Sequence, residues 1–534
     1  MNPLFVQLSI VALYLIGITL YGLHVGKKEA GTKEGYFLGG RSFSWLLIGF
    51  SLFATNINSA SVIGESGLAS KIGLAASNNE LIGGVMLGIS AIFFIPLYLR
   101  NRLYTIPEFL EKRFNRVAKL FFSFNFVVQS ILATPIGFYA GGLAVLHIFG
   151  LDPKYLLLVC VIMGISIGLY SVFGGLASIV YTDRVQASLL IVGCLVITIV
   201  GLQQIGGPRA LYENLGPHYF EFLRPADDPH MPWTTLPGIA LHSAFFAFCS
   251  VAVLQRALGA RSVHDAKMGM LLGSFLKIVT VFMLAIPGMI AAKLYPGAGD
   301  SAIPVLVREL LPSLGFLGLV LSGLVLSGLI SAVMSSADAG VCAISSVIAL
   351  DIYPSCTRKA VNEARALFVG KLAAASIMVY GTFAAPYYGQ LGPIYLMILQ
   401  VGGFMLLPVG TCFILGRFSR RVNEQGAVAT LAIGLVVSVA YIVGTKTPWG
   451  QTLMPDFFVQ AHFYKVYPFF FLFYVAFLYG VSLLFPAPGA DKLAVLEAGP
   501  VAQLAPEIPH PWYATFRFWW IIFLGCVLTL YAIF

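Results

Sequence analysis

Apolar segments of about 20 residues recur from one end of the chain to the other, and this repetition restricts the fold more than any other feature. Each segment is long enough to cross the hydrocarbon core of a bilayer as an α-helix. The 534 residues are 58% hydrophobic and only 10% charged, whereas soluble domains carry roughly 25% charged residues. Short loops join the segments, so we predict an all-α, polytopic membrane protein with a single transmembrane domain over residues 1–534.

Fourteen such segments are predicted, and the cations between them indicate the orientation. The first covers residues 5–25, and lysines follow it rather than precede it, so we interpret it as a retained helix and not as a signal peptide. Lysine and arginine cluster in alternate loops, as cytoplasmic loops require. This clustering explains the net charge of +9 without nucleic acid. It places both termini on the exterior side of a multi-pass protein, which we expect in the plasma membrane, the inner membrane of a bacterial cell.

Polar residues gather in the segment 331–351, SAVMSSADAGVCAISSVIALD, which follows a long apolar run. Ser335, Ser336 and Asp338 lie together near its start. Hydroxyls and a carboxylate inside a membrane helix are costly, so they usually face a cavity and mark the path of an ion or a substrate. Two serines in such a helix also commonly bond back to their own backbone. Both interpretations remain open from these residues alone.

A second polar stretch lies inside the predicted span at about 43–69. Its middle, from Ala54 to Ser61, reads ATNINSAS and is poor in helix formers. An uninterrupted helix gains little from this stretch in lipid. A broken helix exposes free carbonyl groups to an ion, as the discontinuous helices of transporters do. We therefore predict a break here.

Five motifs occur in a fixed order along the chain: YFLGGRSFSW, YTIPEFLEKRFN, YSVFGGLASIVYTDRVQ, QRALGARSVHDAKMG and SSADAGVCAISSVIALDIY. Over about residues 5–420 they resemble the sodium:solute symporter family, and in particular its sodium/glucose cotransporter branch. The resemblance implies a LeuT-like core of two inverted five-helix repeats, at 43–203 and 234–416, with three C-terminal spans in 427–534. It also implies ion and solute sites at the repeat interface near the membrane centre.

The resemblance implies a sodium site between the broken helix and the later serine-rich span. In the family, carbonyls of the broken helix and hydroxyls of the other helix hold the ion. The corresponding positions in this sequence are Ala54, Ile57, Ala332, Ser335 and Ser336. Neutral carbonyl and hydroxyl oxygens suit sodium, which agrees with this assignment.

Two aspartates are candidates for a second cation site or for the sodium exit path. Asp338 lies three residues after Ser335, on the same helix face, where some family members have a second sodium site. Its carboxylate can strengthen such a site or carry a proton, and the alternative is a salt bridge within the bundle. Asp183 corresponds to a family aspartate linked to sodium release, and the alternative is a helix N-cap formed with Gln186.

The resemblance also implies a solute pocket. Glu80 and Lys277 are isolated charges within apolar spans, which favours a function, although a structural ion pair is the alternative. Three residues correspond to family positions that hydrogen-bond a sugar: Glu80, Lys277 and Gln400. Three others depart from the sugar pattern: Ser61 replaces a glutamine, Ser243 an asparagine, and Phe246 the tyrosine that closes the pocket. A sugar needs many paired donors and acceptors, so these changes leave the identity of the solute open.

Together these residues predict a sodium-coupled secondary active symporter that imports a small polar solute by alternating access. We expect a sugar or polyol, and the alternative is a carboxylate, an amino acid or another small metabolite. A membrane sensor is disfavoured because no kinase-sized segment follows the last span. An enzyme is disfavoured because the loops hold no nucleophile elbow, HExxH or paired acids. The seven cysteines show no metal-ligand spacing, so we expect no cofactor and no metal other than sodium, the coupling ion.

Overall fold

The computed structural model describes residues 3–357, 362–388, 393–497 and 510–534. Throughout this described part the chain is helical, and its β-structure is limited to two isolated bridges. The long helices up to the middle of the chain are α1 (Pro3–Gly26), α3 (Trp45–Asn56), α4 (Ser59–Ile72), α5 (Asn78–Phe93), α8 (Arg116–Phe149) and α9 (Leu156–Ile205). The helices that follow, of which α12 and α14 are short, are α11 (Leu236–Cys249), α12 (Val251–Leu258), α13 (Val263–Thr280), α14 (Ile286–Leu294), α16 (Gly315–Val347), α18 (Glu363–Tyr388) and α19 (Pro393–Phe418). The last are α20 (Glu424–Lys446), α23 (Phe463–Leu483) and α25 (Phe516–Ile533).

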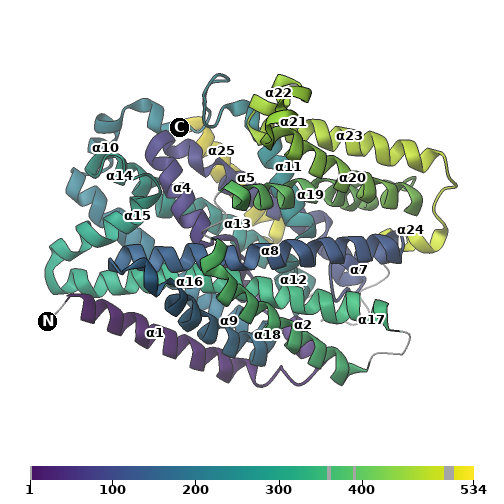
Figure 1. Cartoon of the computed structure of the whole chain (residues 1–534), viewed down its shortest axis with the longest axis horizontal. Coiled ribbons are helices and arrows are strands. Elements are labelled where there is room, and N and C mark those ends of the chain that lie inside the picture. Colours follow the sequence, from purple (N-terminus) through teal and green to yellow (C-terminus); the bar gives the residue numbers. More distant parts are fainter. Residues whose placement is uncertain (1–2, 358–361, 389–392, 498–509) are drawn as a thin grey trace.

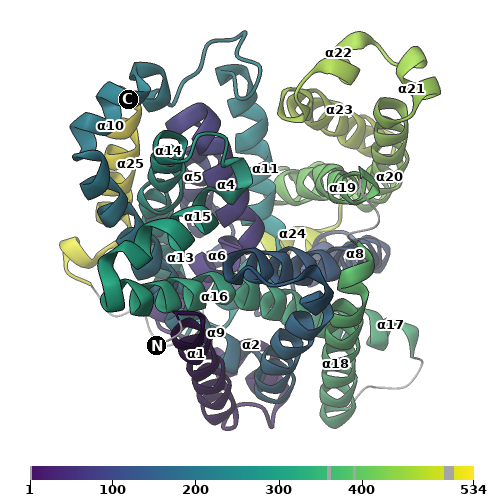
Figure 2. The same ribbon diagram turned by 60° about the vertical axis from the view of Figure 1, so that its left-hand side comes forward.

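Helix α16 lies in the interior of the bundle, where it packs against α1, α3, α8 and α9 (Figure 1). Its side chains from Val325 to Ser335 are all buried. Helices α20 and α23 form a group of their own against α19, at one side of the molecule (Figure 2). Helix α25 lies apart from that group and packs on α13. The apolar helices therefore enclose a central bundle in which polar side chains of α16 are kept from lipid.

The predicted break in the span at about 43–69 is present. Helix α3 ends at Asn56, and Ile57 leaves the helical conformation with φ −92° and ψ 88°. Asn58 is extended and accepts a hydrogen bond on its side-chain oxygen from the Ser61 amide at 2.7 Å, which starts α4. An asparagine N-cap is favourable because it satisfies an amide that the first helical turn leaves unpaired.

A second broken helix, which the sequence did not suggest, lies between α11 and α12. Ser250 has φ −65° and ψ 118°, and the two helices meet at a bend of 46°. Each broken helix opens one of the two predicted five-helix repeats, 43–203 and 234–416. The repeat boundaries themselves stay a prediction.

Helix α9 folds back on itself at Gly175, where φ is 63° and ψ is −157°. Tyr170 and Thr182 lie on either side of this glycine, and twelve residues of straight helix would separate them by about 18 Å. Both nevertheless touch the same point on α1, because a Cβ added at Gly22 would come within 2.9 Å of each. The two halves are therefore antiparallel, as the predicted tight turn between two spans requires. The positive φ favours glycine at this turn.

Ten helices in the described part are long and apolar enough to cross a membrane, or eleven when the bent pair of α11 and α12 counts as one span. This count takes α9 as one helix and omits α3 and the end of α19, which are shorter. The number of 14 spans therefore stays a prediction.

Candidate functional site

The break after α3 lies against the middle of α16. The Ser335 hydroxyl donates a hydrogen bond to the Ala54 carbonyl at 2.9 Å, although the two residues are 281 positions apart. Because α3 ends two residues later, this carbonyl accepts from another helix rather than from the next turn of its own. Ala54, Ile57, Ala332 and Ser335 are all buried. The structure thus brings together the two halves of the predicted sodium site.

The two serines of this site behave differently. The Ser336 hydroxyl donates to the Ala332 carbonyl, one turn back on the same helix, at 2.9 Å. The Ser335 hydroxyl lies 3.3 Å from that same carbonyl while it bonds to Ala54. Backbone bonding, the alternative for both serines, therefore describes Ser336 best. The result is a group of four close oxygens, two carbonyl and two hydroxyl.

Asp183 is completely buried in the second half of α9. Its Oδ2 accepts a hydrogen bond from the Ser51 hydroxyl at 2.5 Å and lies 3.4 Å from Nη2 of Arg256. The N-cap interpretation is wrong, because Asp183 lies two turns past the break at Gly175, inside the helix. The side-chain amide of Gln186 forms no hydrogen bond within the described part of the chain, so it caps nothing.

Asp338 is also completely buried, and its Oδ2 accepts a hydrogen bond from the Tyr170 hydroxyl at 2.6 Å. It forms no ion pair with any described residue, so the salt-bridge interpretation is wrong for this conformation. Asp183 and Arg256 act on it electrostatically without touching it. In both aspartates Oδ1 lacks a hydrogen-bond partner among the described residues. We call this group the aspartate cluster: Tyr170, Asp183, Gln186, Arg256 and Asp338.

A polar cavity of about 220 Å³ lies between the broken helix and helices α5, α11 and α13. We call it the solute cavity. Five of the six predicted pocket residues line it: Ser61, Glu80, Ser243, Phe246 and Lys277. The sixth, Gln400, belongs to α19, and its side chain lies outside the described part of the chain.

Glu80 and Lys277 form an ion pair at the wall of this cavity. Lys277 Nζ donates to Glu80 Oε2 at 2.5 Å, and only 8% and 7% of the two side chains are exposed. Gly83, one turn after Glu80, leaves room for the ammonium group, because a Cβ there would lie 3.3 Å from Nζ. The ion pair is therefore present and it also faces the cavity, and the binding of solute by these two residues stays a prediction. A pair in this position is able to exchange its internal hydrogen bond for bonds to a ligand.

Sequence reasoning missed four polar residues that line the solute cavity: Asn56, Asn58, Asn79 and His242. The Oδ1 atom of Asn79 and the Nδ1 atom of His242 are buried and have no hydrogen-bond partner in the described part of the chain. Buried polar atoms are nearly always paired, so these two indicate a ligand or ordered water. The available signal was that both residues interrupt apolar spans, beside Glu80 and Ser243.

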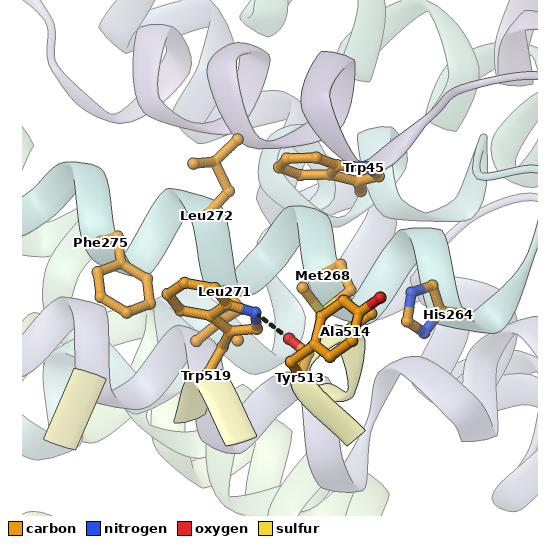
Figure 3. A pocket seen from close by; sticks show the side chains of 9 residues that line it. All are labelled: Trp45, His264, Met268, Leu271, Leu272, Phe275, Tyr513, Ala514 and Trp519. Atoms are coloured by element: carbon orange, nitrogen blue, oxygen red, sulfur yellow. Dashed lines mark hydrogen bonds between the residues drawn. The ribbon is translucent and has the colours of Figure 1, made fainter. Parts of the chain in front are cut away.

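A larger cavity of about 480 Å³ lies elsewhere, between α3, α13 and the start of α25 (Figure 3). Its lining residues are Trp45, His264, Met268, Leu271, Leu272, Phe275, Tyr513, Ala514 and Trp519. None of them is a carboxylate, lysine or arginine, and the indole nitrogen of Trp519 already donates to the Tyr513 carbonyl at 2.8 Å. The smaller, polar cavity is therefore the candidate functional site.

Comparison with known proteins agrees with this geometry. The model of the sodium:solute symporter family matches residues 36–434, about three quarters of the chain. The chain belongs to the sodium:solute symporter family. It is therefore a membrane transporter that couples sodium to a solute, and not an enzyme.

Several characterised symporters of this kind are similar in sequence. The chain is 30% identical to the human sodium/myo-inositol cotransporter over 492 residues, which cover 82% of this chain and 67% of the relative. It is 28% identical to the sodium/glucose cotransporter of Vibrio parahaemolyticus, over 83% of this chain and 85% of that one.

Solved structures show the fold of this symporter. A sodium-coupled sialic acid symporter in an outward-open state superposes with a TM-score of 0.75 at 21% identity, covering 90% of this chain and 98% of that one. Mhp1, a transporter of the nucleobase-cation-symport-1 family, gives 0.55 at 13% identity over 88% of this chain and 100% of its own. The LeuT-like, all-α membrane fold expected from the sequence is confirmed.

Proposed function

We propose that this symporter imports a small sugar or polyol together with sodium, with the solute in the solute cavity and sodium between α3 and α16. The observation that carries the proposal is the 2.9 Å contact between the Ser335 hydroxyl and the Ala54 carbonyl at a helix break. Sodium takes the place of that hydrogen bond and is held by oxygens of Ala54, Ile57, Ala332, Ser335 and Ser336. The ion then joins the two helices through more oxygen contacts than the single hydrogen bond that it replaces.

Coupling follows from the position of the break. Asn56 and Asn58 flank it and also line the solute cavity, and Asn58 holds the first turn of α4 through its bond to the Ser61 amide. An ion that fixes the break therefore also fixes one wall of the cavity. A ligand shifts a conformational equilibrium only by its differential affinity for the two states. Sodium stabilises the conformation that binds solute, and its departure allows the protein to adopt the other conformation of the transport cycle.

The chemistry of the cavity supports a polyhydroxylated solute. Glu80 supplies acceptors, Lys277 supplies donors, and serine and asparagine side chains supply both. Phe246 adds an apolar face. Lys277 is already paired with Glu80 and is the only lysine or arginine on the described wall, so a carboxylate solute finds no free cation there. The names of the similar proteins, cotransporters for myo-inositol and glucose, favour the same class.

The aspartate cluster is our proposed site for a second cation or for sodium on its way out. It contains two buried carboxylates, of Asp183 and Asp338, and one cation, Arg256. One negative charge is left uncompensated, and an isolated buried charge is costly. A sodium ion or a proton removes that cost. Each elementary charge that enters down about 100 mV releases roughly 2.3 kcal/mol, enough for a solute gradient of some tens-fold.

We also propose a plasma-membrane location, with both chain termini outside the cell. The clustering of lysine and arginine in alternate loops supports this orientation. We leave the oligomeric state unassigned.

Uptake into proteoliposomes tests the function. Radiolabelled myo-inositol and glucose should accumulate under an inward sodium gradient and not under a potassium gradient of the same size. Replacing Ser335 and Ser336 together by alanine should raise the sodium concentration for half-maximal uptake by about tenfold or more, because two oxygen ligands are lost. Ser327→Ala is the matched control, since among the described residues the hydroxyl of this buried serine bonds only to the backbone of its own helix, at 2.9 Å from the Gly323 carbonyl. Uptake that ignores sodium, or that responds equally to both changes, contradicts the proposal.

A further inference from the structure

A second carboxylate stands beside the solute cavity. Glu65 lies on α4, one helical turn after the cavity residue Ser61, so it lies on the same side of the helix just beyond the residues that line the cavity. It is only 9% exposed. Its Oε1 accepts a hydrogen bond from the buried Ser77 hydroxyl at 2.9 Å. No motif and no part of the sodium site uses this residue, which lies about two turns after the break in the helix.

The charges around this carboxylate do not balance. Glu80 repels it and Lys277 attracts it. Lys277, however, is engaged by Glu80 at 2.5 Å, and Glu65 forms no ion pair within the described ranges of the chain. Two buried acids therefore share one base. A carboxylate buried without an opposite charge is costly, and inside a membrane bundle it usually belongs to a functional site.

Hydrogen-bond acceptors are also in excess. Asn79 lines the cavity next to Glu80, and its Oδ1 atom is a buried acceptor with no donor in the described part of the chain. The Lys277 ammonium already donates to Glu80, so it leaves the carboxylate of Glu65 and the amide oxygen of Asn79 to other donors. A positively charged amino group supplies both the missing positive charge and the missing hydrogen-bond donors, because it carries one charge and three donors.

We propose, on the basis of the function above, that the solute is a polyol or sugar that carries a cationic amino group, and that Glu65 selects it. The hydroxyl groups of this solute bind the part of the cavity lined by Glu80, Lys277 and Ser243. Its ammonium group binds Glu65 and the Asn79 amide oxygen. Glu65 thus distinguishes an amino sugar from a neutral sugar of the same shape.

Ligand binding to the detergent-solubilised, full-length protein tests this inference. Thermal stabilisation is titrated with two matched pairs, D-glucose with D-glucosamine and myo-inositol with its amino-deoxy analogue, at a pH below the pKa of the amines. The amine of at least one pair should bind about tenfold more tightly than its neutral partner, because a charge pair in a partly buried site is strong. Glu65→Gln should remove this preference and change the affinity for the neutral partner by less than about twofold.

Glu309→Gln is the matched control, since this glutamate is exposed and pairs with the adjacent Arg308. It should leave the preference intact. Absence of stabilisation by both amines, equal affinities within each pair, or a preference that survives Glu65→Gln overturns the inference. If Glu65→Gln does not fold, the wild-type comparison still decides it, and Glu65→Asp, which keeps the charge, should keep the order of affinities. Because binding needs no sodium gradient, a failure here is distinct from a failure of sodium-driven uptake.

Discussion

Two buried regions of this symporter contain the same charges, two acids and one base, but the base forms different contacts in each region. At and beside the solute cavity the groups are Glu65, Glu80 and Lys277, and in the aspartate cluster they are Asp183, Asp338 and Arg256. Lys277 forms one short contact, with Glu80, at the wall of a cavity. Arg256 is completely buried and divides its contacts among the Ser51 hydroxyl, the Ala252 carbonyl and Asp183.

The difference follows from the chemistry of the two cations. An ammonium group is a compact charge on a flexible stem, so it can change partners when a solute arrives. A guanidinium group offers donors in a fixed, planar arrangement, so it holds several groups in place. We conclude that the solute cavity is built to exchange partners. The aspartate cluster is a fixed framework whose remaining negative charge a small cation or a proton would balance.

Of the substitutions that test this comparison, Arg256→Met should have the largest effect, a loss of stability. It leaves Asp183 and Asp338 buried without a cation, and breaking a buried ion pair in this way costs about 3–5 kcal/mol of stability. Chemical unfolding in detergent measures the loss. The double variant with Asp183→Asn should recover most of it, because the uncompensated charge is removed together with its partner. Equal stability of the single and double variants would show that Arg256 contributes packing alone.

Lys277→Met should act on binding more than on stability. Glu80 is then left without its partner, but the cavity lets water or a ligand reach it, so the loss of stability should be smaller than for Arg256→Met. Solute binding should weaken by about thirtyfold or more, because one partner of a buried, hydrogen-bonded charge pair is missing. Isothermal titration and unfolding of the same sample separate the two effects. A stability loss as large as that of Arg256→Met would remove the distinction between the two regions.

Asp338→Asn should have the smallest effect, and it should change only the sodium dependence of uptake. The substitution keeps the shape and the hydrogen bond from Tyr170 while it removes one charge from the aspartate cluster. We expect sodium activation of uptake to become less cooperative, with a change of a fewfold in the sodium requirement, about 1 kcal/mol. Solute affinity at saturating sodium should not change. A lower solute affinity with unchanged sodium dependence would place Asp338 on the solute side of the mechanism.

The membrane class, the helix break and the serine pair were predictable because each has a local signal. Polar residues are rare in lipid-facing helices, so NINSAS between apolar runs and Ser335 in a long apolar segment were informative by themselves. Five pocket residues were identified through the family resemblance. The break between α11 and α12 had no such signal, because Ser250 is a single polar residue between apolar ones and not a polar stretch like NINSAS.

Only the tertiary structure decided which polar group meets which. The sequence near Asp183 allowed a helix N-cap, but the side chain bonds to Ser51, 132 residues away. Asp338 has a tyrosine as its partner instead of a cation, and Glu65 became noticeable only when Lys277 was found engaged by Glu80. A local pattern shows that a polar group is costly to bury. The residue that offsets this cost lies on another helix, and helix packing alone brings the two together.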